Sequence, residues 1–406
     1  MKMFLKAKFI NNSNNIFQGV FVANIISFLA NIVLSRIYNP EDFATFALYT
    51  QIIGVMLITS GGSIFLIIPK REKIDNSNLL NIVLILSVIN LIFFFLINNY
   101  FKFIDLNYIF VILGLLFSII YSFLHISSIT YNDFRFSGNN KVYEKIIGTL
   151  SNILLGLYFT NKLGLIIGNY FGQFTYIFNF IFFKKYKIFK SIRLKNIFSI
   201  IKKKYKFLIS QSTSHLIEVS HTLLFSILIV QKLNLQELGY LYFLLRIIGT
   251  PLTILSDYLS QLSLARISEL KGIHHKRYFI KKFIIILSII STIIVLIFYN
   301  KGADIFNILF GKKWILSGYM SEEYIIGLLS IFIFRSVQYL LNSIDMQHLH
   351  TYFSLILYII PIVLLINFEI FNSSLSVILV ISSISMMTVT VFYILIILIV
   401  FRSFSK

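Results

Sequence analysis

The chain is a succession of long apolar stretches separated by short polar or charged segments. A helix needs about 20 mostly apolar residues to cross the hydrocarbon core of a bilayer, and about twelve stretches approach or exceed that length. They are predicted at 16–36, 43–68, 79–99, 107–129, 143–160, 163–183, 207–231, 235–263, 283–300, 322–345, 352–370 and 374–401. The pattern predicts an all-α polytopic membrane protein with about twelve transmembrane helices.

Composition supports a membrane protein over a soluble one. Charged residues make up 13% of the 406 residues, against roughly 25% in soluble proteins, and hydrophobic residues make up 57%. A soluble domain must leave part of its fold facing water, so it could not hide this much apolar surface. The absence of cysteine excludes disulfides, thiolate metal sites and thiol catalysis. The basic start of the chain is interpreted as a cytoplasmic lead-in, since no cleavage site follows a short apolar core.

The distribution of positive charge orients the predicted helices. The chain has 36 Lys and Arg against 16 Asp and Glu, a formal net charge of +20. If the N-terminus is cytoplasmic and the segments alternate, the outer segments hold only Arg36, Lys102, Lys162, Lys232, Lys301, Lys312 and Lys313. Most of the basic residues then face the cytoplasm, as the positive-inside rule requires. We therefore expect both termini in the cytoplasm, and the basic excess needs no nucleic acid partner.

The most basic inner segment, 184–206, leaves six predicted helices on each side. We expect an N-terminal six-helix lobe at 1–190 and a C-terminal six-helix lobe at 191–406, with 184–206 as a cytoplasmic linker. The first outer loops of the two halves are similar, at 39–44 and 234–239. This similarity fits a parallel repeat, as in some two-lobed transporters, or the ordinary chemistry of helix starts, which favours Asn, Pro and acidic residues.

Several predicted helices carry polar residues at steps of three or four, which places each set on one helix face. The sets run from Asn24 to Ser35, Gln211 to Thr222, Arg246 to Gln261 and Arg335 to Asp345. In lipid such faces must turn toward protein or water, so stripes in both halves predict a hydrated central cavity between two lobes. For small polar residues the alternative is interhelical hydrogen bonding.

Two arginines inside predicted helices are candidates for anion binding. A charged side chain at mid-bilayer costs at least about 2.5 kcal/mol, and the guanidinium groups of Arg246 and Arg335 do not deprotonate. They are predicted to bind an anion in the cavity. The alternative is a structural ion pair, for instance with Asp257 or Asp345.

A group of ionisable residues on the seventh predicted helix is a candidate for ion coupling. Glu218 is flanked by His215 and His221 at i−3 and i+3, so the three side chains can share one helix face. Such a group could hold or pass a proton, and Asp257 and Asp345 are further candidates. The alternative is a hydrogen-bonded polar patch. No metal site, nucleotide-binding fingerprint or nucleophile elbow is recognisable, and no cofactor is expected.

Three segments, taken together and in order, form a set of motifs. The first contains Arg36, Pro40, Glu41, Asp42 and Phe43. The second is 239–252 with Arg246, continuing through Asp257 and Gln261 to Glu269. The third contains Phe310, Gly311 and Trp314, the only tryptophan in the chain. The set resembles the Wzx-type polysaccharide or O-antigen repeat-unit flippases. The sequence departs from the family at Ala44, where relatives have Gly, and at 61–63, where relatives often carry charge, so no site is carried over there.

The resemblance implies a two-lobed fold of the multidrug, oligosaccharidyl-lipid and polysaccharide exporters, with alternating access to a cationic cavity. It implies a lipid-linked oligosaccharide on undecaprenyl diphosphate as substrate, and Arg246 matches the family's arginine. Polysaccharide polymerase and chain-length proteins are expected as partners, beside membrane lipids, in the cytoplasmic (inner) membrane. Two alternatives stay open. One is a drug or cation exporter of the same fold. The other is a membrane polymerase or ligase, for which the outer segment 301–321 is short.

Overall fold

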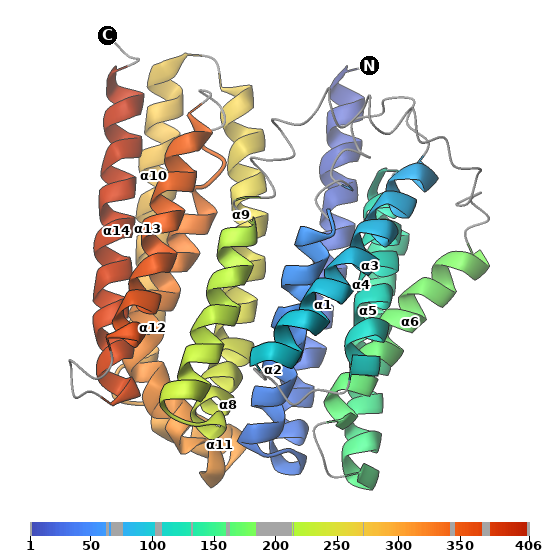
Figure 1. The fold of residues 1–406 in the computed structure, drawn as a ribbon. Helices are drawn as coiled ribbons and strands as arrows, with labels where there is room; N and C mark the ends of the chain where they lie inside the picture. The colour runs from blue at the N-terminus through green and yellow to red at the C-terminus, as the bar shows by residue number, and fades with distance from the viewer. Residues whose placement is uncertain are drawn as a thin grey trace. The chain divides into compact units, whose positions relative to one another are not determined.

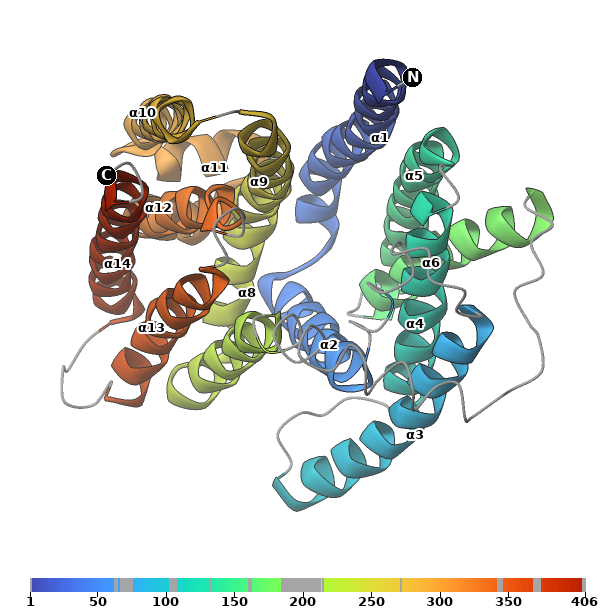
Figure 2. The same cartoon turned by 90° about the horizontal axis from the view of Figure 1, so that it is seen from above.

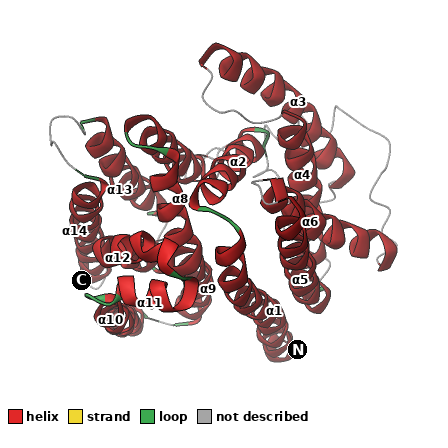
Figure 3. Cartoon of the chain, turned by 90° about the horizontal axis from the view of Figure 1, so that it is seen from below, coloured by secondary structure: helices red, strands yellow, loops and turns green. Residues whose placement is uncertain are grey.

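The structure is a computed structural model that describes residues 2–61, 65, 76–101, 108–130, 133–159, 163–183, 213, 215–270, 272–341, 346–367 and 374–403. Within these residues all regular secondary structure is helical (Figure 3). The prediction of an all-α fold is confirmed. The chain divides into two compact units between residues 223 and 224. The lobe boundary expected near residue 190 lies outside the described residues.

The described part of the first unit, Met1–Leu223, contains six long helices (Figure 1). They are α1 (Lys2–Ile37), α2 (Pro40–Thr59), α3 (Asn76–Phe101), α4 (Tyr108–Thr130), α5 (Phe134–Phe159) and α6 (Leu163–Phe183). A further helix at 215–232 continues across the boundary between the units.

The second unit, Leu224–Lys406, contains the remaining helices. They are α8 (Leu235–Leu244), a π-helical turn at Leu245–Gly249, α9 (Thr250–Glu269), α10 (Ile273–Phe298), α11 (Gly302–Phe310), a 3₁₀ turn at Lys312–Trp314, α12 (Ile315–Ser336), α13 (Gln347–Ile366) and α14 (Leu375–Ser403). α12 contacts α8, α9, α10, α11 and α14, so it forms the centre of this unit (Figure 2).

The outward faces of the helices are apolar. Ile89, Phe93 and Leu96 on α3, and Phe392 and Ile399 on α14, are each more than half exposed. A soluble protein does not expose continuous apolar helix faces of this extent, but hydrocarbon is a good solvent for them. Among the described residues, eight helical segments are long and apolar enough to cross a membrane by length and composition. The chain is therefore a multi-pass membrane protein.

Glycines bring α5 and α6 into close contact. A Cβ atom added at Gly168 on α6 would lie 2.8 Å from the backbone nitrogen of Asn152 on α5, and one at Gly172 would lie 2.9 Å from the Glu144 carbonyl oxygen. Helices in membranes associate through such small residues because lipid supplies no hydrophobic force between them. This close packing fixes the side chains of α5 against those of α6.

Some helices extend beyond the predicted apolar stretches. α5 begins at Phe134 instead of 143, and α10 begins at Ile273 instead of 283. Both helices start within basic segments that hydropathy excludes, because backbone hydrogen bonding continues past the end of the apolar run.

The outer segment 301–321, expected as a loop, contains helix α11 and the start of α12. The spacing of aromatic residues in this segment indicates a helix. Phe306 and Phe310 are four residues apart and both are buried, while Ile308 between them is exposed.

Candidate functional site

Arg246 lies in the π-helical turn that joins α8 to α9. The Thr250 hydroxyl donates to the carbonyl of Leu245 at 3.3 Å across this widened turn. The Arg246 guanidinium hydrogen-bonds to the Tyr242 side chain, one turn earlier. Isolated π turns inside α-helices are frequent at functional sites, since the inserted residue changes the direction in which a side chain points. The sequence contained Arg246 but no signal for this turn.

If α8 begins at the outer surface, as the charge distribution predicts, Arg246 lies near the middle of the bilayer. It lies about 17 Å along the axis from Leu235, the first residue of α8, at 1.5 Å per residue. The hydrocarbon core is about 30 Å thick, so a helix that starts at the outer surface carries Arg246 to mid-depth. A permanent positive charge at this depth requires polar or anionic surroundings.

Arg335 is paired with Asp257. The Nη2 atom of Arg335 on α12 donates to Oδ1 of Asp257 on α9 at 3.0 Å, and the two side chains are 15% and 44% exposed. Gln338 donates to the Ser260 hydroxyl at 3.4 Å beside this ion pair. The geometry matches the structural alternative for Arg335, because an incoming anion would have to compete with Asp257 for the guanidinium.

An aromatic group packs beside Arg335. The His350 ring stacks on Phe334 with a centroid distance of 4.6 Å, and its Nδ1 lies 3.0 Å from the Tyr393 hydroxyl. His350 on α13 and Tyr393 on α14 were not predicted as neighbours of α12. They hold the end of α12 that carries Arg335 against the other two helices.

The residues of the third resembling segment form an aromatic cluster. Trp314 is fully buried and stacks on Phe243 of α8, with ring centroids 3.9 Å apart and planes at 27°. Phe310 meets the same Phe243 edge-on at 5.0 Å. Gly311 between them has a φ of +96°, which residues with a side chain rarely adopt. These residues fix the short helix α11 to α8 and α12, which is a packing role.

The acidic residues of the first resembling segment begin a helix. Pro40 is the first residue of α2, where its missing N–H costs nothing, and Glu41 and Asp42 follow in the first turn. The Asn39 N–H donates to the Asp42 carboxylate at 2.9 Å. In the corresponding loop of the second unit, Asn234 accepts a hydrogen bond from the backbone of Glu237. Both loops therefore cap a helix, and the parallel repeat stays a prediction.

The neighbours of this segment pack against α5. The Tyr38 hydroxyl donates to the carbonyl of Asn152 at 2.8 Å, and the Tyr38 ring meets Phe43 edge-on at 6.3 Å. Burial and the Asp42 carboxylate raise the pKa of Tyr38 to about 12, so its hydroxyl stays protonated and available as a donor. Arg36, in the last turn of α1, is exposed.

The predicted ion-coupling residues of helix 215–232 differ in solvent exposure. His215 is exposed, Glu218 is partly exposed and His221 is buried. Asp345, the other candidate beside Asp257, lies outside the described residues. The coupling role of these residues stays a prediction.

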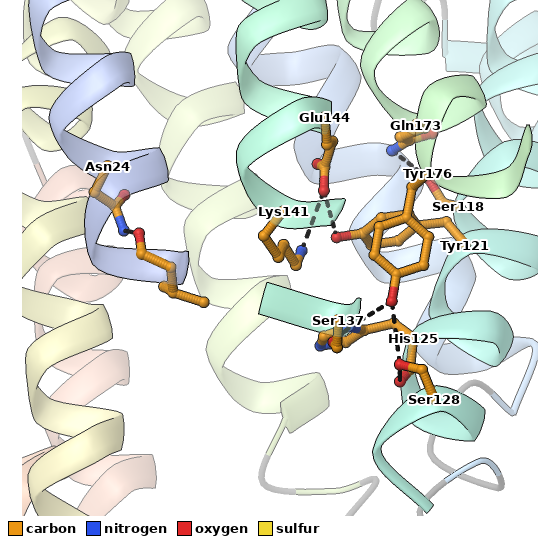
Figure 4. Close-up of polar contacts among 11 residues, drawn as sticks. Asn24, Ser118, Tyr121, His125, Ser128, Ser137, Lys141, Glu144, Gln173 and Tyr176 are labelled. Atoms are coloured by element: carbon orange, nitrogen blue, oxygen red, sulfur yellow. Dashed lines mark hydrogen bonds and ion pairs between the residues drawn. The ribbon is translucent and has the colours of Figure 1, made fainter. Parts of the chain in front are cut away.

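A buried polar cluster in the first unit was not predicted (Figure 4). Lys141 and Glu144 of α5 form an ion pair of 3.4 Å, and Tyr121 of α4 donates to the Glu144 carboxylate at 2.8 Å. His125 lies one turn further along α4 and within electrostatic reach of Glu144. Glu144 and His125 both fall inside predicted transmembrane stretches. An ionisable residue in such a stretch indicates a functional site, and this was the sequence feature that could have predicted the cluster.

Solved transporter structures share this fold. The lipid II flippase MurJ in an inward closed conformation matches with a TM-score of 0.69 at 16% identity, over 93% of this chain and 86% of that chain. An inward-facing multidrug resistance MATE family transporter of the MOP superfamily matches with 0.61 at 14% identity, over 94% and 96%. A MOP superfamily transporter from Pyrococcus furiosus Vc1 matches with 0.57 at 13% identity, over 98% and 96%. At these identities the likeness shows a shared fold and nothing further.

A family model assigns the chain more narrowly. The model described as "Polysaccharide biosynthesis protein" matches residues 33–317. That range is more than half of the chain, so the protein belongs to the polysaccharide biosynthesis protein family. No curated protein matches the chain in sequence. The predicted family resemblance and the membrane transporter fold are confirmed.

Proposed function

We propose that the protein is a flippase that carries oligosaccharide units linked to undecaprenyl diphosphate across the cytoplasmic membrane for surface polysaccharide synthesis. It works by alternating access, coupled to an ion gradient. The proposal is supported by membership of the polysaccharide biosynthesis family, and by the fold that the chain shares with a lipid II flippase.

Arg246 is the observation that carries the proposal. The diphosphate of the carrier lipid is anionic and the sugars are polar, so neither crosses hydrocarbon without a partner. A guanidinium near mid-depth supplies a fixed positive charge with several donors for phosphate oxygens. The prenyl tail needs no such partner, since it is soluble in the surrounding lipid.

The same physics limits the strength of binding. A carrier must release its substrate on the far side, so the diphosphate site has to be weak enough for exchange. One arginine at mid-depth, with Arg335 engaged by Asp257 in this conformation, fits a site of limited strength. Displacement of Asp257 by a phosphate oxygen would recruit Arg335 as a second contact.

No covalent chemistry is part of the proposal. The protein moves an intact lipid-linked unit, and a polymerase with its chain-length partner acts on the unit after it has crossed. The ionisable residues Glu218, His215, His221, Asp257 and Asp345 are kept as candidates for ion coupling.

The experiment is deletion of the gene, followed by extraction of carrier lipid and a test of which membrane face displays the sugar. The proposal expects complete oligosaccharide units to accumulate facing the cytoplasm, and wild-type protein to restore their export. Arg246→Ala should fail to restore it, because loss of a charge-assisted contact of about 1.5–3 kcal/mol weakens substrate binding roughly tenfold to a hundredfold.

Two variants serve as controls. Arg246→Lys keeps the charge but not the planar fork of donors, so partial restoration is expected. Arg402→Ala removes an exposed arginine at the end of α14 and should restore export fully. Complete units that face outward but stay unpolymerised would instead indicate a polymerase or ligase. Unchanged carrier lipid would indicate a drug or ion exporter.

A further inference from the structure

Glu144 is a buried carboxylate deep in the first unit. Its side chain is 10% exposed and lies about 15 Å along α5 from Phe134, the first residue of that helix. If α5 enters the membrane at Phe134, this distance is about half of a hydrocarbon core of about 30 Å. Oε2 accepts the hydrogen bond from Tyr121 and also faces the Lys141 ammonium at 3.4 Å (Figure 4).

His125 lies on the other side of Tyr121. The two rings are nearly parallel, at 10°, with centroids 6.1 Å apart. His125 Nδ1 lies 3.1 Å from the Ser137 hydroxyl and 3.2 Å from the Tyr176 hydroxyl (Figure 4). Tyr176 of α6 in turn lies 3.2 Å from the Ser128 hydroxyl. Three helices thus contribute side chains to one polar group, which we call the Glu144 cluster: Tyr121, His125, Ser128, Ser137, Lys141, Glu144 and Tyr176.

A structural role alone does not explain the charges in this cluster. A buried ion pair usually stabilises a fold no more than a well-packed apolar pair does, because both ions lose their water. The Lys141–Glu144 pair lies within α5, so it does not itself join two helices. Neighbouring helices are joined by uncharged groups elsewhere in this unit, as where Asn179 of α6 donates to Asn140 of α5 at 2.9 Å. A buried carboxylate inside a membrane helix therefore calls for a function beyond packing.

The surroundings of Glu144 and His125 can accept either protonation state. Hydroxyl groups donate or accept by rotation, and both partners of His125 Nδ1 are hydroxyls. A proton added to Glu144 would release the ammonium of Lys141, whose side chain is 21% exposed and lies 4.5 Å above the Tyr121 ring. That ring keeps a favourable contact for the cation after the carboxylate is neutralised.

Few other titratable groups face Glu144 from the helices that pack most closely against α5. α4 contributes Tyr121 and His125, and α6 contributes Tyr176. α1 has no charged residue between positions 18 and 35. On α5 itself Lys141 contacts Glu144 and Lys145 is the next residue, while Arg135 lies about 14 Å nearer the start of the helix. Glu144 and His125 are the groups of this cluster able to gain a proton.

We propose that the Glu144 cluster binds one exchangeable proton, and that this proton couples transport to the proton gradient. Glu144 takes the proton from water at one membrane face as its ion pair with Lys141 opens, and returns it at the other face as the pair re-forms. The coupling role rests on the proposed function. The binding of the proton does not, so the two can fail separately.

The test is infrared difference spectroscopy on the purified full-length protein across a range of pH. The wild type should show a protonated-carboxyl band that disappears at high pH. Glu144→Gln should lack this band, and Glu144→Asp should shift it, since the carboxyl group is kept in a different position. Asn179→Ala removes a buried hydrogen bond to α5 outside the Glu144 cluster, so it should retain the band unshifted.

An unchanged band in Glu144→Gln, or an unshifted band in Glu144→Asp, would overturn the proton site. Glu144→Asp alone decides the matter if the glutamine variant does not fold. For coupling, the variants are expressed in the deletion strain, where Glu144→Gln should lose the dependence of carrier-lipid export on external pH. Wild-type export across that range would overturn the coupling role. A lost band together with unchanged carrier lipid in the deletion strain would refute the proposed flippase and leave the proton site standing.

Discussion

Single residues of the resembling segments divide into two kinds. Phe310, Gly311 and Trp314 build a buried aromatic cluster, and Asp42 caps a helix, so their side chains are used within the protein. Arg246 differs, because its permanent charge lies on a π turn within a long apolar helical segment. We therefore expect substitutions in the first kind to change the free energy of unfolding, and substitution of Arg246 to change transport.

Trp314→Ala should destabilise the protein strongly. The side chain is fully buried against Phe243, and removal of a large buried aromatic costs about 3–5 kcal/mol. Thermal unfolding of the purified protein in detergent measures the effect. Ile308→Ala on the neighbouring helix is the control, because Ile308 is 76% exposed and its truncation leaves no cavity. Equal stability of the two variants would contradict the packing role of Trp314.

The ion pair of Arg335 and Asp257 can be tested with a double-mutant cycle. Each single alanine variant should lower the free energy of unfolding by about 1 kcal/mol, a modest value because the Asp257 side chain is 44% exposed to solvent. The double alanine variant should be no less stable than either single variant, since the second substitution removes the unpaired charge. Additive losses in thermal unfolding would show that the two side chains do not interact.

Whole elements are positioned by features that act between helices. The steps of four between Gly164, Gly168 and Gly172 place a smooth strip of α6 against α5, and that contact brings Tyr176 next to the residues of α4 and α5. In the second unit, α12 lies at the centre and receives side chains from α8, α9, α13 and α14. The polar groups of both units depend on these helix contacts.

Gly168→Ala should weaken the contact between α5 and α6. The added methyl group would collide with the Asn152 side chain and approach its backbone nitrogen to 2.8 Å, and such overpacking costs about 1–3 kcal/mol. Gly148→Ala is the graded comparison on the same contact, because its nearest atom would be the Gly168 carbonyl oxygen at 3.3 Å. Thermal unfolding should rank wild type, Gly148→Ala and Gly168→Ala in that order, and the reverse order would contradict this packing.

At the scale of the whole molecule, topology is the property that function requires. A flippase must present a binding site to each membrane face in turn, so the orientation of the helices decides which loops face the cytoplasm. The chain contains no cysteine, so single cysteines can be introduced and labelled without background.

Lys281→Cys and Ile308→Cys should be labelled from opposite sides of the membrane. Both positions are exposed, the first in the basic start of α10 and the second on α11. A maleimide that cannot cross membranes should label Ile308→Cys on right-side-out vesicles and Lys281→Cys only on inverted vesicles, because basic segments stay in the cytoplasm. The wild type is the unlabelled control, and the opposite pattern would reverse the predicted topology.

The sequence by itself determined the all-α membrane fold, the approximate helices and the family resemblance. These properties follow from local information, because each helix must satisfy its own backbone hydrogen bonds in lipid. Each helix is therefore visible in the sequence as a run of apolar residues. Polar residues inside such runs identified Arg246, Arg335 and Asp257 as candidates before any neighbours were known. The precise helix starts were harder, since helices such as α5 continue into basic segments that hydropathy excludes.

Only the tertiary structure decided which of these residues meet. The pairing of Arg335 with Asp257 joins α12 to α9, and the Glu144 cluster joins α4, α5 and α6. Hydropathy does not specify which helix lies beside which, because lipid solvates every apolar face about equally well. The choice of neighbours is made by close packing at small residues and by hydrogen bonds between helices, and both depend on the three-dimensional arrangement.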